Sequence, residues 1–141
     1  MYMVDKEFLI ERNILKIGNQ LLNGRREDLK EFDITSNQSE TLLFFDRHPG
    51  ARIYDLKIHM KISHQAARNL VERMKEKDLL NVAVSDTDTR ARKICLSEKG
   101  EKICNELKKK GSDVGGNLLQ PLSEEEKEHL FVILDKIIKA L

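Results

Sequence analysis

Apolar residues recur along most of this chain at helical spacing. One wide stripe lies between residues 5 and 22, and the Asn23-Gly24 pair after it predicts the end of that helix. A second stripe runs from residue 130 to 141 and is wider than one small domain needs. Together with the stop signals, the pattern predicts helices over residues 5–22, 38–47, 53–60, 63–77, 97–119 and 123–141.

Polar residues mark the ends of several of these helices. Thr35 with Gln38 fits a capping box, and Pro49 in His48-Pro49-Gly50 ends the helix that the box begins. Ser63, Ser97 and Ser123 each stand where a helix needs an N-cap. In the helix after Ser63 we expect four residues to point inward: Ala67, Leu70, Val71 and Met74.

Two short runs alternate in the way that strands do. They cover residues 79–84 and 93–96, and the polar stretch between them is rich in turn residues. Residues 79–97 are therefore predicted to form a β-hairpin with a charged tip. The fold class that follows is mainly α with one small hairpin, an α+β arrangement in one compact domain.

Composition narrows the class of protein. The 141 residues contain two Cys, too few for a disulfide scaffold. The longest strictly apolar run, residues 130–134, is far shorter than the roughly 20 residues of a membrane helix. The first residues carry charges where a signal peptide needs an apolar stretch. We therefore expect a soluble, cytoplasmic protein that does not enter a membrane.

The small net charge of +1 hides a segregation of charge along the chain. Residues 47–93 hold 11 basic and six acidic side chains, a balance of +5, whereas the rest of the chain holds 14 basic and 18 acidic ones. A basic middle between acidic ends favours a central surface that faces a polyanion, although differing solvated faces would give the same pattern.

A short helix, a tight link and a second helix are the order of a helix-turn-helix, whose second helix enters the DNA major groove. Asn and Gln pair with adenine and Arg with guanine, while Ser and His at the first turn suit phosphate contacts. The alternative is an ordinary amphipathic helix. The residues predicted to touch DNA here are Ser63, His64, Gln65, Arg68, Asn69 and Lys75, with Glu72 on the same outward face.

The hairpin supplies further candidates. Asp88 can hold the Arg90 guanidinium extended toward a narrow, electronegative minor groove, and Arg92 and Lys93 would follow the phosphates. The plain alternative is a surface ion pair of little energetic worth.

The stretch from Asp88 to Ser97 resembles the wing signature of the MarR family of winged helix-turn-helix regulators: Asp, any residue, Arg, five residues, Leu, then Thr or Ser. Ile62 to Gln65, Leu70 to Met74 and Leu79-Leu80 are similar to that family's recognition helix, and the helix ending in His48-Pro49-Gly50 is similar as well. Thr89 stands where many members have Arg, Asp78 where Gly is common, and His64 where Arg or Ser is common.

The resemblance implies a homodimer joined through the terminal helices and a pseudopalindromic DNA operator. It implies that Arg90 enters the minor groove with Asp88 as its positioning partner, and that a small aromatic effector releases the DNA. The corresponding segments are 1–34 for dimerisation and linker, 35–97 for the winged helix-turn-helix, and 98–141 for further dimerisation helices.

Other chemistry has little support in the sequence. Cys95 and Cys104 fit small core residues better than a redox sensor. The four His are too scattered to hold a metal, no cofactor motif is present, and no constellation supports an enzyme. Phe8, Phe32, Phe44 and Phe45 fit core positions better than an effector pocket. The competing interpretation is a winged-helix protein-interaction module without specific DNA binding, because Glu72, Glu76 and Asp78 interrupt the basic face.

Overall fold

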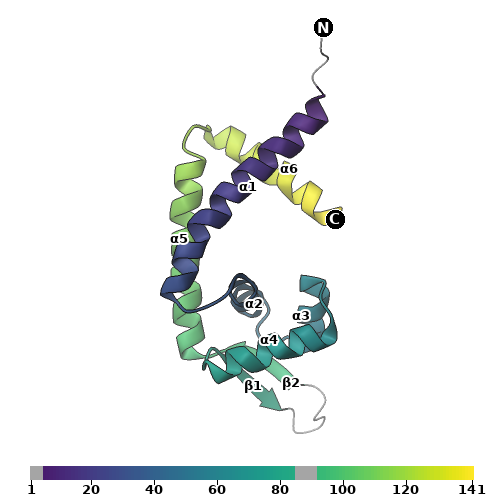
Figure 1. Ribbon diagram of the computed structural model, residues 1–141, viewed down its shortest axis with the longest axis vertical. Coiled ribbons are helices and arrows are strands. Elements are labelled where there is room, and N and C mark those ends of the chain that lie inside the picture. Colours follow the sequence, from purple (N-terminus) through teal and green to yellow (C-terminus); the bar gives the residue numbers. More distant parts are fainter. Residues whose placement is uncertain (1–4, 85–91) are drawn as a thin grey trace. The chain divides into compact units, whose positions relative to one another are not determined.

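The computed structural model describes residues 5–84 and 92–141 of the chain. The bounds of the elements in chain order are α1 Lys6–Glu31, α2 Ser36–Arg47, α3 Ile53–Met60, α4 His64–Glu76, β1 Leu80–Val84, β2 Arg92–Leu96, α5 Glu98–Leu118 and α6 Glu124–Lys139 (Figure 1). The chain divides into two compact units, Met1–Leu107 and Lys108–Leu141, and the boundary falls within α5.

The first helix is longer than its sequence predicts. We expected it to end at Asn23-Gly24, but α1 continues through both residues to Glu31. That prediction was wrong because one Gly inside a helix costs only about 1 kcal/mol, which the flanking turns and the burial of Leu29 offset. The extra turns bring Leu29 and the partly buried Phe32 against the core of the first unit.

The predicted caps are confirmed. The Thr35 hydroxyl accepts from the Gln38 N–H at 3.1 Å, and the Gln38 side chain accepts from the Thr35 N–H at 3.2 Å. Ser63 and Ser123 cap α4 and α6 in the predicted way, and the Ser97 hydroxyl accepts from the Gly100 N–H. These bonds satisfy backbone donors that the first turn of a helix leaves unpaired.

Three helices of the first unit end on a residue with a left-handed backbone that is not glycine. These residues are Asp33 after α1, Lys61 after α3 and Asp78 after α4, with φ of 54°, 54° and 61°. After each one, the next amide donates to the carbonyl five residues back: Ile34 to Leu29, Ile62 to Lys57 and Leu79 to Met74. The turn after α4, where Gly is common at such a left-handed position, is therefore kept with Asp78 in its place.

The hairpin pairs β1 and β2 antiparallel, with Val82 opposite Ile94. A bridge between Ala51 and Ile94 adds a third short segment, because the Gly50 N–H donates to the Ile94 carbonyl and the Ile94 N–H to the Ala51 carbonyl, both at 2.9 Å. The residues after Pro49 thus join α2 to the hairpin as well as ending the helix.

The core of the first unit lies between α2, α3, α4, the hairpin, the C-terminal end of α1 and the N-terminal part of α5. Its most buried side chains include Leu42, Phe45, Leu56, Met74 and Ile94. Phe44 and Phe45 are core residues as expected, whereas Phe8 is 56% exposed in this chain, so its core assignment was wrong. Cys104 is buried as expected, but Cys95 is exposed on β2, because Ile94 takes the core-facing side of that strand.

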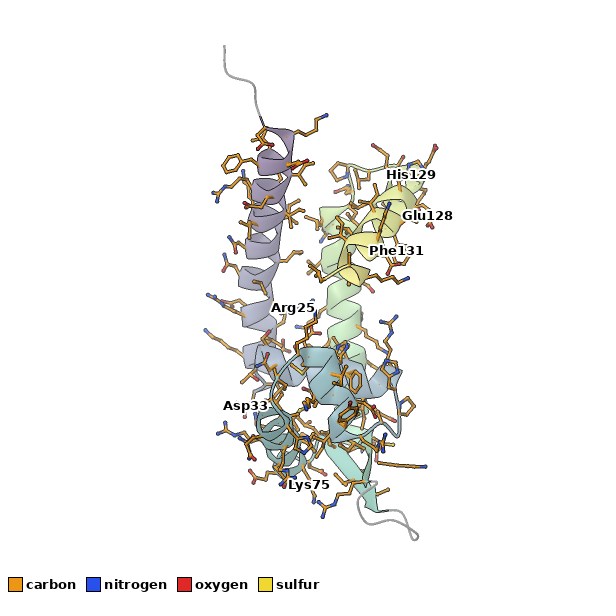
Figure 2. The ribbon with its side chains drawn as sticks, turned by 90° about the vertical axis from the view of Figure 1, so that its right-hand side faces the viewer. Arg25, Asp33, Lys75, Glu128, His129 and Phe131 are labelled. Carbon is orange, nitrogen blue, oxygen red and sulfur yellow. The ribbon has the colours of Figure 1, made fainter. Side chains whose placement is uncertain are left out.

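The described helices also leave apolar faces uncovered. On α1 the exposed large apolar side chains are Phe8, Leu9, Ile10, Ile14, Leu15, Ile17, Leu21 and Leu22. On α6 they are Phe131, Val132, Ile133, Leu134, Ile137 and Ile138, and Figure 2 labels Phe131 on this helix. Among the described residues, we find no helix with the length and apolar character needed to cross a membrane.

Candidate nucleic-acid interface

The candidate interface centres on α4, whose N-terminus is fixed by Ser63. The Ser63 hydroxyl accepts from the Ala66 N–H at 3.1 Å, so the first turn begins at a defined residue. The left-handed Lys61 turns the chain sharply between α3 and α4. In Figure 1, α3 and α4 lie next to each other with the hairpin beneath α4, the arrangement that the sequence predicts for a winged helix-turn-helix.

Opposite faces of α4 carry opposite kinds of side chain. Ala67, Val71 and Met74 are buried as expected, and Leu70 is half-buried. The predicted outward residues of the helix are all exposed: His64, Gln65, Arg68, Asn69, Glu72 and Lys75. The structure therefore places the predicted residues of this helix on one solvent-facing surface. We call these residues, with Ser63, the α4 face.

Two amides on the α4 face are hydrogen-bonded to each other. The Gln65 Nε2 donates to the Asn69 Oδ1 at 3.0 Å, one helical turn away. This bond restricts the rotation of both side chains and leaves the Gln65 oxygen as an acceptor and the Asn69 amide N–H groups as donors. Such a mixed set of polar groups matches the edges of bases better than it matches phosphates, which offer acceptors alone.

The charge on the α4 face is mixed. Arg68 and Lys75 are exposed, and Figure 2 shows Lys75 labelled on this helix. Arg73, which the sequence interpretation did not single out, is exposed as well, and so are Glu72 and Glu76. Cations therefore outnumber the carboxylates only slightly along α4, and the rest of the basic character of the middle segment comes from its neighbours.

The structure describes part of the predicted wing. Arg92 and Lys93 are exposed at the start of β2, where the Ala51 bridge ties the same strand to the body of the unit. Asp88 and Arg90 lie outside the described residues, so their predicted partnership stays a prediction.

The C-terminal end of α4 carries a set of contacts that sequence reasoning missed. The Lys77 Nζ donates to the backbone carbonyl of Asp33 at 2.6 Å and to the Gln38 Oε1 at 3.1 Å. These partners are 44 and 39 residues away, so no local pattern signals the contact. The capping box that contains Gln38 was predictable, but its second role as an acceptor for Lys77 was not.

The same end of α4 is joined to the start of α5. The Ser97 hydroxyl donates to the Asp78 carbonyl at 2.6 Å, and the Ser97 N–H donates to the Leu79 carbonyl at 3.0 Å. The Lys99 Nζ donates to the Lys77 carbonyl at 3.2 Å. Carbonyls that the end of α4 leaves unpaired are thereby satisfied from another helix.

Within residues 5–84 and 92–141, no group of three or more His, Cys, Asp or Glu side chains is arranged to hold a metal ion. His48 and His59 instead pack against the Phe44 ring, with centroids 4.9 and 4.8 Å apart.

Known proteins share this fold over nearly the whole chain. A DNA complex of MepR from S. aureus is 25% identical with a TM-score of 0.78, and the match covers 96% of this chain and 99% of that one. The transcriptional regulator SlyA is 22% identical over 93% and 92% of the two chains, with a TM-score of 0.81. FabT from Streptococcus pneumoniae, solved with DNA, is 17% identical over 95% and 96%, with a TM-score of 0.85.

The architecture is thus that of a winged helix-turn-helix protein. The model of the MarR family matches residues 32–91, which include α2, α3, α4 and β1. Together with the shared fold, this match confirms the resemblance to the MarR family that the sequence carries. No curated protein sequence matches the chain.

Proposed function

We propose that this chain is a DNA-binding transcription regulator that reads the major groove with α4. The observation that carries the proposal is the α4 face, where polar and cationic side chains gather on the solvent side of a helix that is packed firmly on its other side. The family match and the neighbours solved with DNA support it.

In this proposal the contacts divide by type. Three residues read base edges: Gln65, Arg68 and Asn69. The DNA phosphates are contacted by Ser63 and His64 at the start of α4 and by Lys75 along its side. Arg92 and Lys93 follow the phosphates beside the hairpin, and Arg90, positioned by Asp88, enters the minor groove. Replacing Arg90 with Ala is expected to weaken operator binding severely without unfolding the protein.

We propose further that the protein acts as a homodimer on a pseudopalindromic operator. The exposed apolar faces of α1 and α6 support this assembly, since a monomer rarely leaves so many large apolar side chains in water. The segments 1–34 and 98–141 then supply the dimerisation helices around the winged helix-turn-helix of residues 35–97. Two-fold symmetry places the half-sites about one turn of DNA apart, roughly 34 Å.

A repressor released by a small aromatic effector is the mode of regulation that the family resemblance favours. The test is a search for molecules that lower the affinity for the operator without unfolding the protein. A protein whose operator affinity responds to no aromatic ligand, or whose binding raises transcription, would contradict this part of the proposal.

The second candidate function is a protein-interaction module without specific DNA binding. The exposed Glu72 and Glu76 on α4 favour it, because they oppose the attraction of phosphates. Salt dependence separates the two functions, since each phosphate that is neutralised steepens the fall of affinity with salt.

The deciding experiment is fluorescence anisotropy with DNA from the region upstream of the protein's own gene and with a scrambled duplex, at several salt concentrations. The proposal predicts tight binding to the native duplex alone and a steep salt slope. Equal, weak binding to both duplexes would overturn specific recognition and favour the interaction module.

A further inference from the structure

The Lys77 side chain connects the C-terminal end of α4 to the junction of α1 and α2. It leaves the C-terminal end of α4 and donates to two acceptors where α1 and α2 meet. They are the Asp33 carbonyl after α1, at 2.6 Å, and the Gln38 Oε1 in the first turn of α2, at 3.1 Å. Figure 2 labels Asp33 at the end of α1. A charged donor makes these bonds stronger than bonds between neutral groups.

Both acceptors are themselves held in place. Asp33 follows the end of α1 in a left-handed conformation, at a helix terminus whose partial negative charge favours an ammonium. Gln38 is 4% exposed, and its Oε1 also accepts from the Thr35 N–H at 3.2 Å in the capping box. The ammonium of Lys77 is therefore anchored to rigid groups rather than to mobile side chains.

The backbone around Lys77 is anchored on another side. The Lys77 carbonyl accepts from the Lys99 Nζ, and the Asp78 carbonyl accepts from the Ser97 hydroxyl. Backbone carbonyls at the end of α4 thus accept hydrogen bonds from side chains at the start of α5, and the Lys77 side chain joins the same end of α4 to the end of α1. Lys77 takes part in both connections.

We propose that Lys77 is a positioning residue for DNA recognition, one that fixes the tilt of α4 relative to the corner between α1 and α2. This inference rests on the proposed function. The 13 residues of α4 span about 18 Å at 1.5 Å per residue. A tilt of about 5° at the Lys77 end therefore moves the far end, which carries His64 and Gln65, by about 1.6 Å, whereas hydrogen bonds tolerate only about 0.3 Å.

Such a shift affects two kinds of DNA contact differently. Bonds to base edges depend on distance and angle, so they are lost when the helix tilts. The attraction of cations to phosphates changes little over the same distance. Loss of the Lys77 ammonium is therefore expected to reduce the preference for the operator while preserving general attraction to DNA.

The experiment compares Lys77→Met, Lys77→Arg and, as a matched loss of one positive charge, Lys102→Met on the exposed side of α5. Affinities are measured for the operator and for a scrambled duplex over a range of salt. We expect Lys77→Met to lower the ratio of operator affinity to scrambled-duplex affinity about tenfold, which corresponds to about 1.4 kcal/mol. Its salt slope should equal that of Lys102→Met. Lys77→Arg, which keeps the charge, should restore most of the ratio.

A second measurement needs no DNA. Amide hydrogen exchange at Ile34 and Leu79, whose N–H groups close the turns after α1 and α4, should quicken in Lys77→Met but not in Lys102→Met. An unchanged ratio, or an equal loss for both duplexes, overturns the positioning role. If the wild-type protein does not distinguish the duplexes, both the proposed function and the role of Lys77 in DNA recognition fail. The exchange rates report separately whether Lys77 joins the end of α4 to the junction of α1 and α2.

Discussion

Gly100 in the first turn of α5 faces the carbonyl oxygen of Leu79 so closely that a Cβ at position 100 would lie within 3.0 Å of that oxygen. The same carbonyl accepts from the Ser97 N–H, so it is not free to move away. Glycine at this position thus allows the segment after α4 to contact the start of α5.

We expect Gly100→Ala to lower the free energy of unfolding by about 2 kcal/mol, because the new methyl group must displace backbone. Urea denaturation measures the change. Gly24→Ala is the matched control: it lies inside α1 with open space around it, and Ala there should raise stability by up to about 1 kcal/mol. Equal effects of the two substitutions would contradict the close contact with Leu79.

The left-handed residue between α3 and α4 gives a second prediction. A side chain in this conformation costs roughly 1–2 kcal/mol relative to glycine, so Lys61→Gly should raise the free energy of unfolding by about 1 kcal/mol. Lys102→Gly, in the interior of α5, should instead lower it by about 1 kcal/mol. Stability that falls in both variants would mean that the Lys61 side chain contributes more than its backbone conformation costs.

A third prediction separates base reading from phosphate contact on the α4 face. Under the proposed function, Asn69→Ala should remove about 1–3 kcal/mol of discrimination at one operator position, since Gln65 holds the Asn69 amide on the α4 face. Lys75→Ala should weaken binding to all duplexes alike and reduce the salt slope by about 1. Anisotropy titrations over single-base operator variants measure both, and the reverse pattern would exchange the two assignments.

The fourth prediction concerns the apolar face of α6. Ile138, 63% exposed in the single chain, should be buried by a second copy, so Ile138→Glu is expected to convert the dimer to a monomer. Lys136→Glu changes charge on the same helix without adding a carboxylate to an apolar position. Light scattering at several protein concentrations gives the assembly state, and a dimeric Ile138→Glu protein would place the interface elsewhere.

The cap of α6 makes a prediction about pH. The Ser123 backbone N–H, with help from the Ser123 hydroxyl and from His129, lowers the pKa of the Glu126 carboxyl below its ordinary value. A lowered folded pKa stabilises α6 above the ordinary carboxyl pKa, and this contribution is lost as the pH falls through the lowered value.

Ser123→Ala removes the hydroxyl but keeps the backbone N–H, so the Glu126 pKa should rise part of the way toward its ordinary value. Carbon NMR titration of the carboxyl measures it, with Ser112→Ala as the control. No rise in Ser123→Ala would mean that the hydroxyl does not act on the carboxylate.

Much of the fold could be predicted because its signals are local. A capping box such as Thr35 with Gln38 needs residues three apart, and the inward positions of α4 repeat within one or two turns. The exposed set on that helix followed from the buried set, so the α4 face was predictable by subtraction. The helix end that was misplaced by more than two residues, at Asn23-Gly24, was a case where a local stop signal competed with burial further along the helix.

Apart from the C-terminal end of α1, the sequence by itself determined the helices, the pairing of β1 with β2, the caps and which side of α4 faces solvent, because each depends on local patterns of residues. Only the tertiary structure decided that Lys77 reaches Asp33 and Gln38, that Ser97 binds the Asp78 carbonyl, and that Ala51 pairs with Ile94. These contacts join residues 19 to 44 positions apart, and whether such pairs meet depends on how the elements between them pack rather than on any local pattern.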